Sequence, residues 1–212
     1  MVEPESPLQD AAELIPALQF MAKACGLSEN FLINLFRETD DWSFVIKAHA
    51  LLESVVCSLI ATHLRRPELE HVFANDVEMS ARIKVLKALD LVSEDDRRMM
   101  RALGTLRNDL VHNAEATEFR FTEYFRNKQL RDNFVATFGL NWPDPVPGPT
   151  VGESRSRKTY VLENPRYAIW ASVLGIVKHT VDELHQRLLD KAVRGLMDAA
   201  PGRSEPSSSP SR

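Results

Sequence analysis

The sequence predicts an all-α fold, a bundle of about six or seven helices followed by a disordered C-terminal tail. Three observations support this prediction. Only 8 glycines occur in 212 residues, and almost no stretch alternates apolar and polar residues as a half-buried strand would. Apolar residues instead recur at spacings of three and four, which is typical of helices with one buried face. With 44% hydrophobic residues, the chain is long enough to bury one good-sized core.

Residues 1–39 predict an N-terminal helical extension. Ser6-Pro7 can begin a first helix, because proline is favoured at the first helical position. Gly26 ends this helix, and Pro16 is expected to kink or break it. Ser28 can then cap a second, short helix.

Residues 40–138 are expected to form the helical core. Asp40 or Asp41 can cap a helix of roughly 24 residues, since a short acidic side chain accepts hydrogen bonds from the first free backbone N–H groups. The interior of this helix is apolar on most faces, which indicates the central helix of the bundle. We expect it to end at Arg65-Arg66-Pro67.

Three further segments complete the predicted core. A helix is expected over residues 79–91. Ser93 begins the next helix with a capping-box-like pattern that includes Asp96, and this helix should end near His112. Residues 118–138 predict a turn and one shorter helix.

The remaining residues predict a loop, a helix and a tail. Residues 139–163 form a proline-rich and basic loop, in which Tyr160-Val161-Leu162 is expected to be extended. Asn164 as cap and Pro165 at the first position begin a long helix to about Ala199 that packs on the core. The Ser/Pro-rich residues 200–212 cannot bury enough apolar surface to fold and are expected to be disordered.

Composition restricts the class of protein. The net charge of −4 argues against binding nucleic acid by charge alone, which usually requires a basic surface. Cys25 and Cys57 lie in apolar, helix-like segments without metal-ligand spacing, so we expect reduced thiols, no metal and no cofactor. The acidic residues 1–10 do not resemble a signal peptide, and no membrane span is evident. These features predict a cytoplasmic protein.

The most informative segment is Arg107-Asn108-Asp109-Leu110-Val111-His112. Arg-Asn-x-x-x-His near the end of a helix resembles the signature of the HEPN superfamily of helical proteins. Many of its members are metal-independent endoribonucleases with a composite site at a dimer interface. The resemblance therefore implies a HEPN-like helical bundle, a homodimer, and Arg107, Asn108 and His112 as candidate catalytic residues.

Two upstream segments make the resemblance more specific. Met79-Ser80-Ala81-Arg82-Ile83-Lys84 and Ala88-Leu89-Asp90-Leu91-Val92-Ser93, together with the later motif, are similar to the mannitol operon repressor family. The similarity covers residues 40–135, about half the chain. Asp90 stands where the family usually has glycine, and Leu110-Val111 replaces an aromatic-alanine pair. This branch implies a regulatory function.

Helical geometry sets a condition on any catalytic use of the motif. Asn108 and His112 lie about 40° apart around a helix and share a face, whereas Arg107 lies about 140° from His112. The Arg107 and His112 side chains of one chain therefore do not point to a common site. Two chains related by a two-fold axis could bring their histidines and arginines together in one cleft. There a histidine would act as general acid or base, and arginine would hold a phosphate.

A purely structural interpretation stays open. His112 and Asn113 can simply terminate a helix, where the dipole favours a cation and asparagine takes the left-handed cap. Arg107 can neutralise Glu53, which lies in an otherwise apolar stretch and would be costly to bury alone. With His49 one turn earlier, His49–Glu53–Arg107 would form a structural polar network.

Three functions are therefore expected to compete. The first is a regulator that acts as a dimer, through a protein partner or weak RNA or other nucleic-acid contact at the motif. The second is a toxin-like, metal-independent ribonuclease that uses Arg107, Asn108 and His112, with Glu53 supporting Arg107. The third is a non-catalytic helical scaffold.

Overall fold

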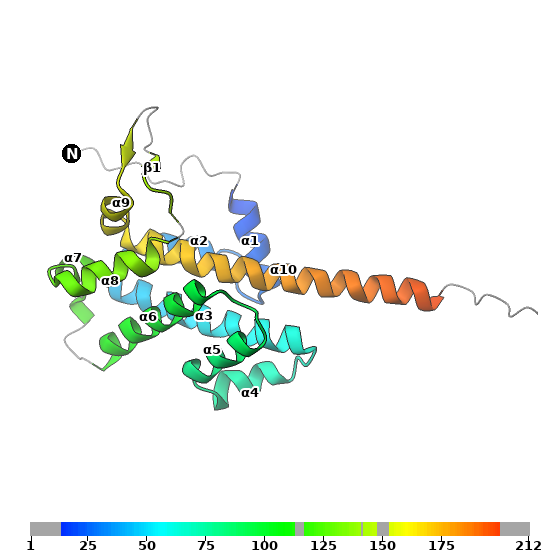
Figure 1. Cartoon of the computed structure of the whole chain (residues 1–212). Helices are drawn as coiled ribbons and strands as arrows, with labels where there is room; N and C mark the ends of the chain where they lie inside the picture. Colours follow the sequence, from blue (N-terminus) through cyan, green and yellow to red (C-terminus); the bar gives the residue numbers. More distant parts are fainter. Residues whose placement is uncertain (1–13, 113–116, 141, 148–152, 200–212) are drawn as a thin grey trace, which may run out of the picture.

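Ten helices and one two-stranded hairpin make up the described part of the chain in a computed structural model (Figure 1). The structure describes residues 14–112, 117–140, 142–147 and 153–199. The all-α prediction is confirmed. The count exceeds six or seven because short helices form between the long ones. The predicted start of the first helix, at Ser6-Pro7, and the predicted tail lie outside the described residues.

The elements follow one another along the chain in a simple order. Their bounds are α1 Leu14–Ala24, α2 Phe31–Phe36, α3 Asp41–Leu64, α4 Leu69–Asp76, α5 Met79–Ala88, α6 Glu94–Val111, α7 Phe121–Tyr124, α8 Lys128–Phe138, β1 Val146–Pro147, β2 Ser154–Arg155, α9 Arg157–Glu163 and α10 Pro165–Ala199. The two strands pair antiparallel, with Val146 opposite Arg155.

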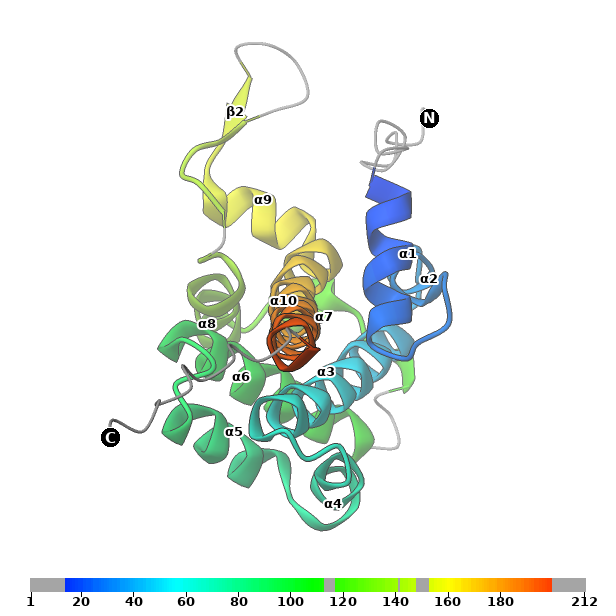
Figure 2. The ribbon, with the colours of Figure 1, turned by 90° about the vertical axis from the view of Figure 1, so that its right-hand side faces the viewer.

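Helix α3 is the central helix, as its apolar composition predicts. It begins because the Asp40 carboxylate accepts a hydrogen bond from the Ser43 N–H at 2.8 Å. It ends at Arg65, whose left-handed backbone (φ 57°) closes the last turn. Helices α4, α5, α6 and α10 all pack against it. Figure 2, which looks along α10, shows α3 and α10 side by side at the centre of the bundle.

Helix α3 is also long and apolar enough, by length and composition, to span a membrane. Its place in the bundle explains that composition differently, because 67% of its most apolar window is buried among the other helices. A core helix surrounded on several sides by other helices needs apolar residues on most of its faces.

Helix α10, the last helix of the described chain, packs against the N-terminal helices as well as the core. Its first half packs along α3 and also contacts α1, α2, α6, α8 and α9. The Trp170 indole N–H donates to the Leu32 carbonyl at 3.1 Å and ties α10 to α2. The last turns of α10 extend past the bundle (Figure 1), but Arg187 still donates to the His63 carbonyl and Asp190 still pairs with Arg65 at the end of α3. The long C-terminal helix and its packing on the core are therefore as predicted.

Helix α6 begins and ends where its local sequence indicates. Ser93 accepts from the Asp96 N–H, and Asp96 accepts from the Ser93 N–H, so the predicted capping box is present. Met99, Met100 and Leu103 bury one face of the helix. The helix closes at His112, whose N–H donates to the Asn108 carbonyl at 3.0 Å.

Two predicted elements differ from the structure. Tyr160-Val161-Leu162, expected to be extended, lies in α9, because the Ser156 hydroxyl caps that helix and Val161 is fully buried. The helix expected over residues 79–91 ends earlier, at Ala88, because Asp90 adopts a left-handed conformation with φ 53°. Glycine adopts that conformation most easily, and aspartate is one of the few other residues that tolerate it.

Candidate functional site

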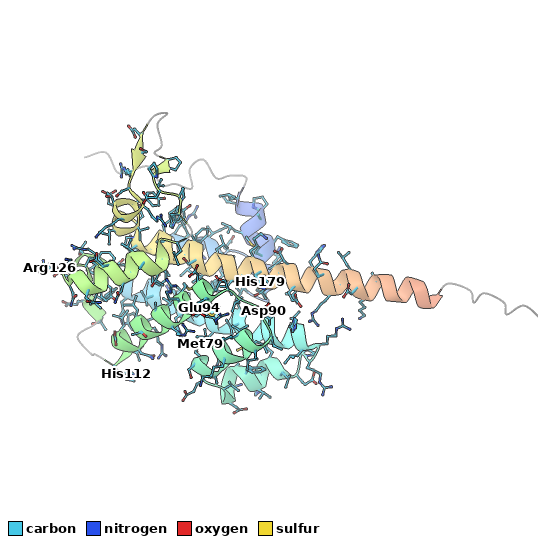
Figure 3. All side chains as sticks on the ribbon, in the orientation of Figure 1. Met79, Asp90, Glu94, His112, Arg126 and His179 are labelled. Carbon is cyan, nitrogen blue, oxygen red and sulfur yellow. The ribbon has the colours of Figure 1, made fainter. Side chains whose placement is uncertain are left out.

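The end of α6 presents the motif residues to solvent. Asn108 and His112 are exposed, and Arg107 is partly buried. The Arg107 guanidinium donates to the Asn108 side-chain oxygen at 3.1 Å. Figure 3 shows His112 at the tip of α6, pointing away from the bundle. Within the described residues, the His112 ring has no hydrogen-bond partner, so the fold of this part does not engage it.

An apolar residue belongs to the same surface. Val111 precedes His112 and is 45% exposed, although its neighbour Leu110 is buried in the core. We call Arg107, Asn108, Val111 and His112 the α6 surface. It combines one cation, one amide, one imidazole and one apolar side chain on two turns of helix. Such a mixture of aromatic, cationic and apolar groups suits a binding surface.

A polar cluster lies behind this surface, between α3, α5 and α6. It consists of His49, Glu53 and Arg82. His49 Nδ1 lies 3.4 Å from one Glu53 carboxylate oxygen, and the Arg82 guanidinium lies 3.5 Å from the other. His49 Nε2 faces α6, 3.6 Å from where a side chain on Gly104 would begin. The cluster thus reaches α6 one turn before Arg107.

The partner of Glu53 differs from the one expected. Arg82, not Arg107, forms the ion pair, and only 5% of Arg82 is exposed. Arg82 also donates to the Val77 carbonyl at 2.7 Å and to the Ala74 carbonyl at 3.1 Å. Arg107 acts on Glu53 only through its charge. The His49–Glu53 contact is present as predicted, and Arg82 takes the place that was expected for Arg107.

These contacts change the acidity of Glu53. The hydrogen bond from His49 lowers the pKa of the Glu53 carboxyl, and the charges of His49, Arg82 and Arg107 lower it further, against the opposite effect of burial. Glu53 is therefore ionised at neutral pH. A small pocket of about 230 Å³ adjoins the cluster and is lined by Glu53, Cys57, Glu70 and Arg82, among others.

A signal for Arg82 was present in the sequence. Arg82 lies three residues after Met79 and four before Leu86, so it shares a helix face with two apolar residues. An arginine in that position must enter the core and needs an acidic partner there. Arg107, four residues after the buried Leu103, also lies near the apolar stripe of α6 but is only partly buried, so sequence position alone does not decide between the two arginines.

The two cysteines have the protonated thiols of an apolar environment. Burial raises the pKa of Cys25 to about 11, and burial also raises the pKa of Cys57. Neither cysteine takes part in a disulfide. Among the described residues, no group of three His, Cys, Asp or Glu side chains is placed to hold a metal ion.

The chemistry that one copy can perform follows from this geometry. Cleavage of RNA by acid–base catalysis requires both a base for the 2′-hydroxyl and an acid for the leaving oxygen. The α6 surface of one chain supplies a single histidine, so a catalytic site would need a second copy, whereas binding a partner would not. In comparisons with protein-family models, with curated proteins and with solved structures, the chain matches none.

Proposed function

We propose that this protein is a non-enzymatic regulator that acts as a dimer through its α6 surface. The observation that carries the proposal is that Asn108, Val111 and His112 are exposed together at the end of a helix whose opposite face is fully used in the core. The fold holds this end of α6 in place without engaging the His112 side chain within the described residues. The similarity of residues 40–135 to the mannitol operon repressor family supports the same function.

The composition of the α6 surface supports binding rather than catalysis by a single chain. Val111 gives it an apolar centre, and Arg107 and His112 give it hydrogen-bond donors for acidic groups of a partner or for phosphate. The net charge of −4 limits any nucleic-acid contact to a weak, local one. A two-fold dimer would bring two such surfaces together, because an isologous interface uses the same patch on both copies.

One observation favours the alternative of a metal-independent ribonuclease. The His112 ring is exposed at the tip of α6, as a catalytic acid or base would need to be. In a dimer, two copies of His112 could serve as acid and base, with Arg107 and Asn108 holding the phosphate. No observation specifically favours the scaffold alternative, because a scaffold does not require the His112 ring to be exposed.

Two measurements test the proposed function. Sedimentation equilibrium of Val111→Asp should give half the mass of the wild type, because a buried carboxylate at the centre of the interface opposes association. Val72→Asp is the matched control: Val72 on α4 is similarly exposed, at 41%, and should leave the mass unchanged. An equal mass for Val111→Asp and wild type would remove the α6 surface as the dimer interface.

The second measurement separates the regulator from the ribonuclease. A mixed, end-labelled RNA pool is incubated with the purified protein in excess EDTA, alongside His112→Ala. We expect no cleavage by either protein. Cleavage by the wild type alone would replace the regulator with the ribonuclease and assign His112 to its site.

A further inference from the structure

A cavity lies where α9 and α10 meet, and we call it the α10 cavity. Its volume is about 490 Å³, which suits a small organic molecule. The end of α2, the start of α3, the start of α7 and the junction of α9 with α10 (Figure 1) all contribute to its lining. Four segments that are distant in the sequence therefore enclose it, and its lining residues are different from those of the α6 surface.

Aromatic side chains form part of this lining. The Phe36 ring lies edge-on to the Tyr167 ring, with centroids 5.5 Å apart, and edge-on to the Trp170 ring at 5.1 Å. Phe121 from α7 lines the same cavity. Trp170 and Phe121 are buried in the core, whereas Phe36 and Tyr167 are only partly buried. The two partly buried rings can therefore pack against a flat apolar part of a ligand.

The acidic residues of the lining are occupied by bases of the fold. Each of them forms an ion pair: Glu38 with Lys47, Asp41 with Arg166, and Glu163 with Arg155. A carboxylate that is already paired repels an anionic ligand less than an unpaired one does, because the charge of the base offsets its own. The acids on the lining therefore do not prevent an anion from binding.

Among the described residues, Arg37 is the charged side chain of this lining that forms no ion pair and no hydrogen bond. It lies at the end of α2 and is exposed. Thr39 and Thr122 line the cavity beside it, and their hydroxyl groups have no hydrogen-bond partner in the described part of the chain either. The α10 cavity thus offers a guanidinium and two hydroxyl donors to a ligand.

Backbone donors at the start of α10 add to this character. Asn164, expected to cap α10, donates instead through its side chain to the Tyr160 carbonyl at 3.0 Å. Within the described residues, no side chain accepts from the N–H of Arg166 or Tyr167, and both residues line the cavity. Unpaired N–H groups in the first turn of a helix favour a negative charge nearby. They act here together with Arg37 and the aromatic lining.

We propose that the α10 cavity binds a small organic acid, with its flat apolar part against Phe36 and Tyr167 and its acidic group on the Arg37 guanidinium. The acidic group is a carboxylate or a phosphate, because an arginine holds either one through two parallel hydrogen bonds. The proposal goes beyond the α6 surface, since neither the cavity nor its ligand involves residues 107–112.

The test is a titration of the isotopically labelled full chain, followed by nuclear magnetic resonance. The Trp170 indole N–H is the reporter, because Trp170 lines the cavity and donates to the Leu32 carbonyl. Benzoate and phenyl phosphate are the probes and should shift this signal to saturation, with a dissociation constant of about 1 mM. Benzyl alcohol has the ring without the charge and acetate has the charge without the ring. Each should bind about tenfold more weakly than benzoate.

Two pairs of variants locate the binding. Arg37→Gln should weaken benzoate binding by about tenfold. Arg66→Gln is its matched control, because Arg66 is an exposed arginine beyond the other end of α3, and it should bind as the wild type does. Thr122→Asp places an acid on the lining and should weaken binding, whereas Thr122→Asn, of the same size, should not. All four changes fall on exposed residues, so the melting temperatures should agree within a few degrees.

Three results would overturn the proposal. The first is the absence of a saturable shift with either acid. The second is benzyl alcohol binding as tightly as benzoate, which would make the cavity an apolar site without an anion position. The third is an equal effect of Arg37→Gln and Arg66→Gln. Saturable binding of only one of the two acids would support the proposal and identify the acidic group. None of these variants alters Val111, so this test and that of the α6 surface are independent.

Discussion

Arg82 and Arg107 show how position decides what an arginine does. Both lie near Glu53, but Arg82 is buried and donates to two carbonyl groups at the end of α4, whereas Arg107 is only partly buried and contacts Asn108. A buried guanidinium must be paired, because an unpaired one is costly in a low dielectric. Arg82 therefore belongs to the fold, and Arg107 is free to serve binding.

The first prediction compares these two arginines by replacing each with methionine. Arg82→Met leaves the Glu53 carboxylate and the Ala74 and Val77 carbonyls without a donor and should lower the free energy of unfolding by about 2 to 4 kcal/mol. Arg107→Met should change it by less than about 0.5 kcal/mol. Urea unfolding followed by circular dichroism measures both. Equal losses would mean that Arg107, too, is structural.

The second prediction concerns pH. The pKa of Glu53 lies below its ordinary value of 4.5 in the folded protein, so its ionised form stabilises the fold above pH 4.5, and this contribution is lost as the pH falls through the lowered pKa. Glu53→Gln should therefore melt below the wild type at neutral pH. The gap between the two melting temperatures should shrink in acid. A gap that stays constant from pH 7 to about pH 3 would contradict this assignment.

At the scale of elements, capping residues determine where the main helices begin, whereas packing against the bundle determines the conformation of the other segments. Asp40 and Ser93 fixed the starts of α3 and α6, because a cap depends on neighbours within three residues. Helix α4 has apolar residues at helical spacing, Leu69, Val72 and Phe73, but none of its residues is fully buried, so its apolar side packs only at the edge of the core. Helix α9 has β-branched and aromatic residues that favour a strand, yet burial of Val161 against the bundle overrides that preference.

In the candidate site, features within one helix could be predicted from the sequence, whereas contacts between helices could not. The sequence predicts that α6 ends near His112 and that the motif lies at this end. The capping box fixes the start of the helix, and its apolar residues continue at helical spacing as far as Leu110. The His49–Glu53 contact could be predicted too, since the two residues lie one turn apart. The ion pair of Arg82 with Glu53 joins helices α5 and α3. Because this pair depends on how the two helices pack, the spacing of residues within either helix does not predict it.

The third prediction concerns Gly104, in the middle of α6. A methyl group there would lie 3.6 Å from His49 Nε2, which is an ordinary contact. Alanine in place of glycine within a helix stabilises it by about 0.5 to 1 kcal/mol. Gly104→Ala should therefore raise the free energy of unfolding by that amount. Gly104→Leu should lower it, because the larger side chain displaces the His49 ring; stabilisation by leucine would show that α3 and α6 are not held this closely.

At the scale of the whole molecule, Asp41 joins three distant segments. Its carboxylate accepts from the Phe121 N–H at 2.9 Å and lies 3.5 Å from the Arg166 guanidinium. Arg166 also donates to the Glu38 carbonyl at 2.9 Å. The start of α3 thereby holds the start of α7, 80 residues later, and the start of α10.

The fourth prediction tests whether this joint makes the bundle one cooperative unit. Asp41→Ala removes an acceptor and a charge from a largely buried position and should lower the free energy of unfolding by about 2 to 3 kcal/mol. Asp41→Asn keeps an oxygen for the Phe121 N–H and should cost less. Because α3, α7 and α10 share the joint, tryptophan fluorescence and circular dichroism should still report one transition in urea. Two separate transitions in Asp41→Ala would mean that α10 and α3 fold as independent parts, held together at this carboxylate rather than along their shared apolar faces.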